Sequence, residues 1–254
     1  MKGRTILKWV RRVWITLGMA FLAWLFWNVQ AHGVPVELFE STDRLTVEVR
    51  AEATLFLPAP DAPDRPGLLF LPGGGIDWRA YGPVVRSVAD AGYPAAIVRL
   101  PYRVAPTDAT RAEVWRRIEN VRGAWGATRR WVLSGHSRGA ALAGRFADEH
   151  RGSFDGLLLI ATTHPRDQNL SNLTVPVTKV LAEHDCVASP AAARANAHLL
   201  PAETLWIEIA GGNHAQFGHY GSQFNDCRAT ISREAQQKQA IDAVLELLRG
   251  LAVR

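Results

Sequence analysis

The sequence predicts an α/β domain, built on a mainly parallel sheet with helices on both faces and preceded by one N-terminal membrane helix. Three observations support this. The composition is globular, a long uncharged apolar run lies near the N-terminus, and short strand-like runs alternate with helix-like segments from residue 45 onward. Of the 254 residues, 48% are hydrophobic and 21% are charged, which excludes a disordered chain. Alternating strands and helices favour parallel strands joined by crossover helices, so both faces of the sheet are covered.

The formal net charge of +5 arises at the N-terminus. Lys2, Arg4, Lys8, Arg11 and Arg12 stand among the first twelve residues, which contain no acidic residue. The remaining 24 basic residues are balanced by 24 acidic ones. A surface that binds phosphate groups needs a basic face on the folded body. We therefore expect no nucleic-acid binding.

The first predicted element is the membrane helix. Residues 13–29 contain no charged residue, and 17 helical residues extend roughly 25 Å, near the lower limit for crossing a bilayer. Trp9 and Trp14 lie toward one end of this run, and Trp24 and Trp27 toward the other, as suits indole rings at two membrane interfaces. The basic end should remain cytoplasmic, which places the rest of the chain outside the cytoplasm.

A cleaved secretory signal is the alternative interpretation of this segment. Val29-Gln30-Ala31 is an acceptable small-residue cleavage site, although the tryptophan-rich core is long and bulky for a signal. We expect a membrane-anchored protein with an extracytoplasmic catalytic domain; the alternative is a secreted or periplasmic protein. The predicted organisation is an anchor or signal over residues 1–31, a polar connector over 32–44 and one α/β domain over 45–254.

The elements of that domain follow from apolar patterning. Short runs rich in aliphatic residues indicate strands, and apolar residues at helical spacing indicate helices. The predicted strands are 45–50, 54–58, 67–71, 95–100, 130–134, 154–160, 177–181 and 204–210. The predicted helices are 81–91, 110–122, 137–150, 190–199 and 232–251. The first two strands are short and come before the α/β alternation begins, so we expect them to be antiparallel edge strands.

Glycine, proline and apolar periodicity mark the ends of several elements. The third strand stops at Pro72 and Gly73, and the helix after it ends at Gly92. The fifth strand runs into a turn with flanking glycines before an alanine-rich helix. The last helix has its apolar positions at Ile241, Val244, Leu245, Leu248 and Leu251.

The most informative motif is Gly135-His136-Ser137-Arg138-Gly139, which fits G-x-S-x-G between a predicted strand and a predicted helix. An abrupt strand-to-helix turn forces the serine into a strained backbone conformation, and side chains two residues to either side would collide. Glycine at both places relieves the crowding, so the hydroxyl projects above the strand ends. Ser137 is therefore the candidate nucleophile.

A serine hydroxyl needs a base, and the base needs an acid that fixes its tautomer. The expected chain order is serine, acid, histidine, and Asp185 and His214 follow successive predicted strands in that order. Both lie at carboxyl ends of strands, where open α/β sheets place their sites. Other candidates are Glu183 and Asp226 for the acid, and His136, His184 and His219 for the base.

Acyl transfer also needs hydrogen-bond donors for the oxyanion. The backbone amide of Arg138, next to the nucleophile, is one candidate, and the Pro72–Gly75 loop should supply the other. Gly74 is the first choice there and Gly75 the second. We expect the Arg138 guanidinium to face solvent. The histidines match no familiar metal-ligand spacing, so no metal and no cofactor are expected.

Three segments resemble a known family. Residues 71–83 (LPGGGIDWRAYGP), 135–143 (GHSRGAALA) and 211–223 (GGNHAQFGHYGSQ) are similar to the bacterial membrane-anchored alpha/beta hydrolase fold-5 group of the α/β-hydrolase superfamily. The resemblance implies an α/β-hydrolase fold and a Ser137–Asp185–His214 triad. It implies no particular substrate.

The two cysteines depart from that resemblance. Cys186 and Cys227 stand where glycine is expected in such relatives, each directly after an aspartate. Outside the cytoplasm a disulfide can form, so we expect a Cys186–Cys227 bridge; two free thiols are the alternative. Only the 16 residues 161–176 separate two predicted strands where many relatives insert a lid. We therefore expect no large lid domain and an open, shallow site.

The sequence thus predicts a serine hydrolase that cleaves carboxylic esters or thioesters of small acyl substrates through an acyl-enzyme. An amidase that uses the same residues is a second interpretation. A non-catalytic, membrane-tethered binding module is the third, because one fold hosts many functions.

Overall fold

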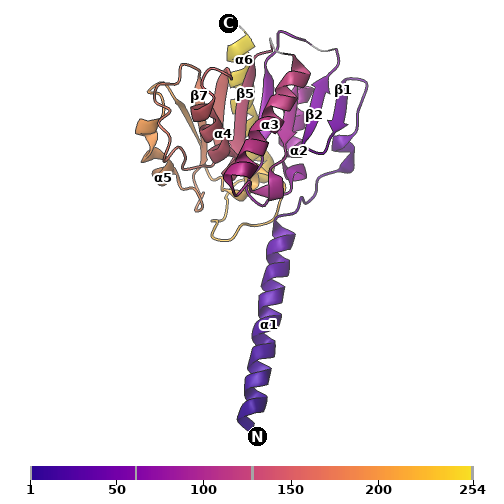
Figure 1. Ribbon diagram of the computed structural model, residues 1–254, viewed down its shortest axis with the longest axis vertical. Helices are drawn as coiled ribbons and strands as arrows, with labels where there is room; N and C mark the ends of the chain where they lie inside the picture. Colours follow the sequence, from indigo (N-terminus) through magenta and orange to yellow (C-terminus); the bar gives the residue numbers. More distant parts are fainter. Residues whose placement is uncertain (1, 61, 127–128, 253–254) are drawn as a thin grey trace.

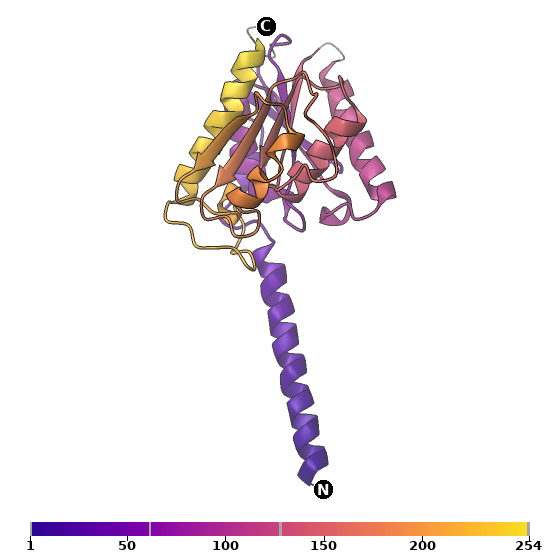
Figure 2. The same ribbon diagram turned by 90° about the vertical axis from the view of Figure 1, so that its left-hand side faces the viewer.

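The computed structural model describes residues 2–60, 62–126 and 129–252. A long helix, α1 (Lys2–Asn28), projects from an α/β body, and the C-terminus lies at the opposite end of that body (Figures 1 and 2). From Ile6 to Asn28 this helix is long and apolar enough to cross a membrane, and the body covers none of its most apolar stretch. Its composition and length also fit a signal sequence.

The body contains one eight-stranded sheet in the order β1-β2-β4-β3-β5-β6-β7-β8. Its strands are β1 (Leu45–Val49), β2 (Ala53–Pro58), β3 (Gly67–Leu71), β4 (Ala95–Val98), β5 (Trp131–His136), β6 (Gly156–Ile160), β7 (Val177–Ala182) and β8 (Leu205–Ile209). Strand β2 pairs antiparallel with β1 and with β4, and the other pairs are parallel. The predicted mainly parallel sheet with an antiparallel edge is therefore confirmed.

Helices cover both faces of the sheet, as predicted. The helices that follow α1 are α2 (Gly82–Asp90), α3 (Asp108–Trp125), α4 (Arg138–Glu149), α5 (Pro190–Arg194) and α6 (Arg233–Ala252). Alternate strand residues point to opposite faces. Leu68 and Phe70 pack with α2 and α6, whereas Leu69 and Leu71 pack with α3 and α4. All 16 residues between β6 and β7 are described, and they contain no helix or strand.

The predicted helix over residues 190–199 is wrong in its length. Helix α5 ends at Arg194, and a separate 3-10 turn covers Ala197–Leu199. The Asn196 side chain donates to the carbonyl oxygens of Thr163 and Ala192. Asparagine side chains compete with the helical backbone for hydrogen bonds, and the bond to Thr163 holds this residue where the helix ends.

The segment after α1 packs onto the body. Val29 O accepts a hydrogen bond from Asp77 N at 2.8 Å, and Asn28 O accepts one from Gly221 N at 2.9 Å. Within the predicted connector, the Phe39 ring lies 5.0 Å from the Trp78 ring, centroid to centroid. The base of α1 is thus attached to the loop after β3 and to the loop after β8.

Candidate active site

Ser137 occupies a sharp turn between β5 and α4. Its backbone angles are φ 52° and ψ −114°, a conformation that costs free energy for any residue with a side chain. A Cβ atom on Gly139 would lie 2.0 Å from Leu71 O, and one on Gly135 would lie 2.5 Å from the Gly139 carbonyl carbon. Any side chain at either glycine would therefore force the backbone apart. The steric role predicted for the two glycines agrees with this geometry.

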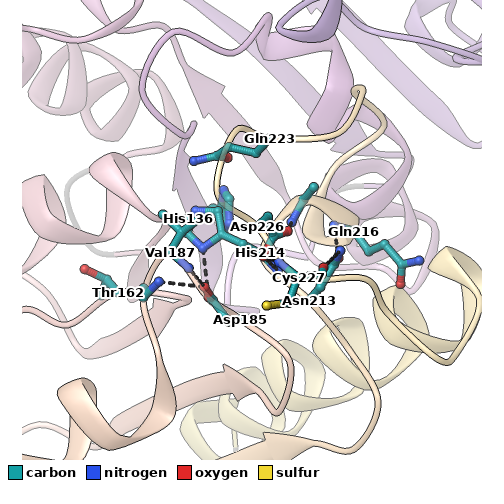
Figure 3. Close-up of polar contacts among 12 residues, drawn as sticks. His136, Thr162, Asp185, Val187, Asn213, His214, Gln216, Gln223, Asp226 and Cys227 are labelled. Atoms are coloured by element: carbon teal, nitrogen blue, oxygen red, sulfur yellow. Dashed lines mark hydrogen bonds and ion pairs between the residues drawn. The ribbon is translucent and has the colours of Figure 1, made fainter.

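The structure brings Asp185 and His214 together beneath the surface. The Asp185 side chain follows β7, the His214 ring follows β8, and His214 Nδ1 lies 2.8 Å from Asp185 Oδ2 (Figure 3). Asp185 is 2% exposed and His214 is 0% exposed. The other carboxylate oxygen, Oδ1, accepts hydrogen bonds from Val187 N at 2.9 Å and Ala188 N at 2.6 Å. These donors fix the carboxylate, and the carboxylate fixes the imidazole.

The contact with Asp185 determines the tautomer of His214. A carboxylate accepts hydrogen bonds, so Nδ1 carries the proton and Nε2 is left with a free lone pair. Within the described part of the chain, Nε2 is buried and has no hydrogen-bond partner, Ser137 included. The His214 ring lies 4.6 Å from that of His136, the residue before Ser137, centroid to centroid. A buried basic nitrogen without a partner therefore lies close to the nucleophile turn.

The two alternative acids, Glu183 and Asp226, accept hydrogen bonds from the backbone of the histidine loop (residues 211–227). Glu183 Oε2 accepts from Gly211 N at 2.8 Å. Asp226 accepts from His214 N at 3.3 Å and from Ala215 N at 2.9 Å. Burial raises the pKa of Asp226. Neither carboxylate is hydrogen-bonded to the imidazole of His214.

The alternative histidines His184 and His219 also form hydrogen bonds with groups other than the Asp185 carboxylate. His219 Nε2 donates to Gln237 Oε1 at 3.0 Å, and burial lowers the pKa of His219. His184 Nδ1 donates to Arg228 O at 3.2 Å. Both rings are only partly buried at the side of the histidine loop.

His136 belongs to a hydrogen-bonded relay that the sequence did not indicate. Gly73 N–H donates to Tyr81 Oη at 3.1 Å, and Tyr81 O–H donates to His136 Nδ1 at 2.8 Å. Burial raises the pKa of Tyr81. Burial, and secondly the electrostatic effect of the neighbouring His214 imidazole, lowers the pKa of His136 well below its usual value. Both groups are therefore neutral, and they tie the loop after β3 to the end of β5.

The Gly73–Gly75 loop lies against the nucleophile turn. A Cβ atom on Gly74 would come within 3.1 Å of Arg138 Cβ. Gly75 N–H donates to Arg103 O at 2.9 Å and Gly73 N–H to Tyr81, whereas the amide of Gly74 has no partner within the described residues. Arg138 begins α4, so its amide also has no intrahelical partner. Among the described residues, two backbone donors without a partner thus come from neighbouring segments.

The expected solvent-facing position of the Arg138 guanidinium is wrong. The side chain is half-buried, with Nε donating to Val104 O at 3.0 Å and Nη2 to Ala105 O at 2.9 Å. The segment after β4 folds over the start of α4, where its carbonyl oxygens meet the guanidinium. Sequence patterning could not reveal this contact because it joins residues more than 30 positions apart.

A disulfide joins the two loops that carry Asp185 and His214. Cys186 and Cys227 are bonded, with their Cα atoms 5.3 Å apart and a separation of 41 positions in the sequence. Asn213, which precedes His214, donates through Nδ2 to Cys227 O at 2.7 Å. The bridge thus fixes the acid loop against the histidine loop.

A family model described as "Alpha/beta hydrolase family" matches residues 67–238, more than half of the chain. The chain belongs to the alpha/beta hydrolase family. Comparison with curated protein sequences gives no significant match.

Solved structures share the hydrolase fold at low sequence identity. Carboxylesterase CesB (YbfK) from Bacillus subtilis is 14% identical, with a TM-score of 0.58 over 85% of this chain and 94% of that one. A membrane phospholipase A, described as a bacterial virulence factor, is 16% identical, with a TM-score of 0.57 over 98% of this chain and 99% of that one. TT1662 from Thermus thermophilus is 14% identical, with a TM-score of 0.58 over 81% of this chain and 98% of that one. The family match supports hydrolase activity, and these neighbours share the fold.

Proposed function

We propose that this hydrolase is a serine esterase, acting on carboxylic esters or thioesters through an acyl-enzyme. One observation carries the proposal: the buried Asp185–His214 pair presents an unpartnered Nε2 close to the strained Ser137 turn. A carboxylate that orients an imidazole beside a serine is the arrangement that activates a hydroxyl nucleophile.

The reaction then takes two steps. Ser137 Oγ attacks the acyl carbon while its proton passes to His214 Nε2, and the resulting imidazolium gives that proton to the departing alcohol or thiol. In the second step a water molecule loses a proton to Nε2 and attacks the acyl-enzyme, and the proton returns to Ser137 Oγ as the acid leaves. Asp185 holds the imidazole and stabilises its charged form throughout. Serine–histidine hydrogen bonds commonly tighten only when substrate is bound.

The oxyanion is assigned to the amides of Gly74 and Arg138. Neither amide has a hydrogen-bond partner among the residues that the structure describes, and their segments lie in contact. The positive end of the α4 dipole adds to this stabilisation, because Arg138 is the first residue of that helix.

We further propose that α1 anchors the enzyme in a membrane, with the catalytic body on the non-cytoplasmic side. The basic residues at the start of the chain favour this orientation. The disulfide suits an oxidising compartment. Cleavage after Ala31 would remove Asn28 and Val29, whose carbonyl oxygens attach α1 to Gly221 and Asp77. These contacts support an uncleaved anchor over a cleaved signal.

The test compares 4-methylumbelliferyl butyrate hydrolysis by the full-length protein in detergent with that of two variants. Ser137→Ala should lose at least about 10³-fold in kcat/KM. Ser134→Ala is the matched control: Ser134 lies on β5, three residues before Ser137, it is buried and its hydroxyl has no partner among the described residues. The control should keep its activity. If Ser137→Ala retains wild-type turnover, or the wild type hydrolyses neither esters nor amides, the esterase proposal is wrong.

A further inference from the structure

A cavity of about 230 Å³ lies where α1 meets the catalytic body. Its lining combines apolar side chains and Gly74 with three polar residues, Asn28, Ser222 and Gln223. The apolar residues are Leu25, Val29, Ile76, Tyr220 and Phe224, and together with Gly74 we call them the acyl port. Leu25 belongs to the apolar helix, Gly74 to the loop proposed to bind the oxyanion, and Tyr220 and Phe224 to the segment that follows His214. The cavity thus joins the surface of the membrane helix to the site of chemistry.

Two contacts link the port to residues that lie beside the reacting groups. Gly74 faces Arg138 Cβ, directly after the nucleophile, as the 3.1 Å approach of an added Cβ shows. The buried Tyr220 ring lies 6.5 Å from the His136 ring, centroid to centroid, and its hydroxyl donates to His214 O at 3.5 Å. An acyl group in the port would therefore have its carbonyl end near Ser137.

The histidine loop also reaches down alongside α1. Figures 1 and 2 show the loop that precedes α6 descending beside the C-terminal end of α1. The Phe224 ring meets the Phe21 ring edge-on, with centroids 6.2 Å apart. Phe21 precedes Asn28 by seven residues, about 10 Å along a helix axis. A ring that packs beside Phe21 therefore lies within the length of the apolar helix, at the depth of the membrane.

The exposure of the Phe224 ring also supports a position of this ring beside lipid. Phe224 is 59% exposed, and the neighbouring faces of α1 present further exposed aromatic and aliphatic side chains, such as Phe21. Apolar rings left this exposed next to a membrane helix are stabilised when lipid replaces water around them. With α1 in a membrane, the side of the port that Phe224 lines would border lipid.

We propose that the substrate is an acyl lipid resident in the bilayer, whose chain enters through the acyl port between α1 and the histidine loop. This rests on the proposed esterase function and on α1 being the membrane anchor. The cavity is smaller than the ~300–1,000 Å³ of typical ligand pockets, so it encloses only the part of the chain next to the ester. The rest of the chain stays among the lipids. This proposal differs from the open, shallow site expected from the short segment between β6 and β7, because it adds a part that α1 covers.

Two esters with the same leaving group test the proposal. The full-length enzyme is reconstituted in vesicles of a non-hydrolysable ether phosphatidylcholine that carry 4-methylumbelliferyl oleate, and 4-methylumbelliferyl butyrate is supplied in water. The measured quantity is the ratio of oleate to butyrate turnover, which cancels differences in the amount of folded protein. Fluorophosphonate labelling of Ser137 is recorded for every variant as an independent measure of the assembled site.

Leu25→Trp fills the port, and Phe224→Asp places a charge at its mouth without touching the buried core. Each should lower the ratio about tenfold or more, since pockets discriminate by this much when a few methylenes no longer fit. Phe26→Trp is the matched control, because Phe26 is an exposed neighbour on α1 that does not line the cavity. It should keep the wild-type ratio.

The outcomes separate the two proposals. Hydrolysis of butyrate together with labelling of Ser137 supports the esterase proposal. If, in that case, both port variants keep the wild-type ratio, or the oleate ester in vesicles is not cleaved, the acyl port is refuted and the esterase proposal stands. If neither ester is cleaved and no label attaches, the esterase proposal falls and the port falls with it.

Discussion

The glycine two residues after Ser137 offers the sharpest test of how the nucleophile turn is built. In Gly139→Ala the new methyl group would lie 2.0 Å from Leu71 O and 2.5 Å from Pro72 O. Cβ atoms keep at least about 3 Å from such neighbours, so α4 and the end of β3 must separate by about 1 Å. Both obstacles are backbone oxygens, one at the end of the central strand β3 and one in the residue that follows it, and backbone atoms cannot rotate away as a side chain can. Overpacking of this kind costs typically ~1–3 kcal/mol, and we expect the upper end of that range or more.

The same displacement separates the nucleophile turn from the Gly73–Gly75 loop. A misplacement of about 1 Å can cost ~10²-fold in rate, so fluorophosphonate labelling of Gly139→Ala should slow by about that factor. Stability is measured by urea unfolding. Gly144→Ala is the control within the same helix: its nearest neighbour is Leu170 Cδ1 at 3.9 Å, and it should gain ~0.5–1 kcal/mol. Wild-type stability and labelling in Gly139→Ala would refute the steric argument.

Three further predictions concern the acid, the disulfide and a buried lysine. Asp185→Asn should lower kcat for butyrate ester about 10⁴-fold because the amide no longer holds the proton on Nδ1 of the histidine; turnover within tenfold of wild type would contradict this. Denatured, unreduced protein should show no free thiol at Cys186 or Cys227, and reduction should lower the free energy of unfolding by about 3–4 kcal/mol for the enclosed loop, whereas two titratable thiols would exclude the bridge. Lys179 is fully buried on β7, and burial lowers its pKa to about 7. The unfolded chain keeps this proton up to about pH 10.4, so it binds more protons than the folded state between pH 7 and 10 and stability should rise across that window. Lys179→Met should flatten the rise, and equal slopes in urea unfolding at several pH values would contradict the assignment.

Local patterning predicted the framework because each strand is a short apolar run with a clear end. The sequence range predicted for β3 agrees with the structure, and the other strands differ from their predicted ranges only near their ends. The pairing of Ser137 with two flanking glycines could also be understood from sterics alone, since the collisions arise within a few residues of the turn.

Contacts between distant segments could not be predicted in this way. The relay from Gly73 through Tyr81 to His136 joins three elements, and no spacing in the sequence marks it. Periodicity placed a helix over residues 190–199 but could not show that Asn196 finds the Thr163 carbonyl and ends it. The proximity of Phe224 to Phe21 likewise depends on how the body docks onto α1.

Peptide mapping of the full-length enzyme after reaction with a fluorophosphonate tests the central claim most directly. The proposed mechanism predicts one phosphonyl adduct on Ser137, formed rapidly in the wild type and abolished when His214 is replaced by Ala. An adduct on another residue, or no adduct while the protein is folded, would contradict it.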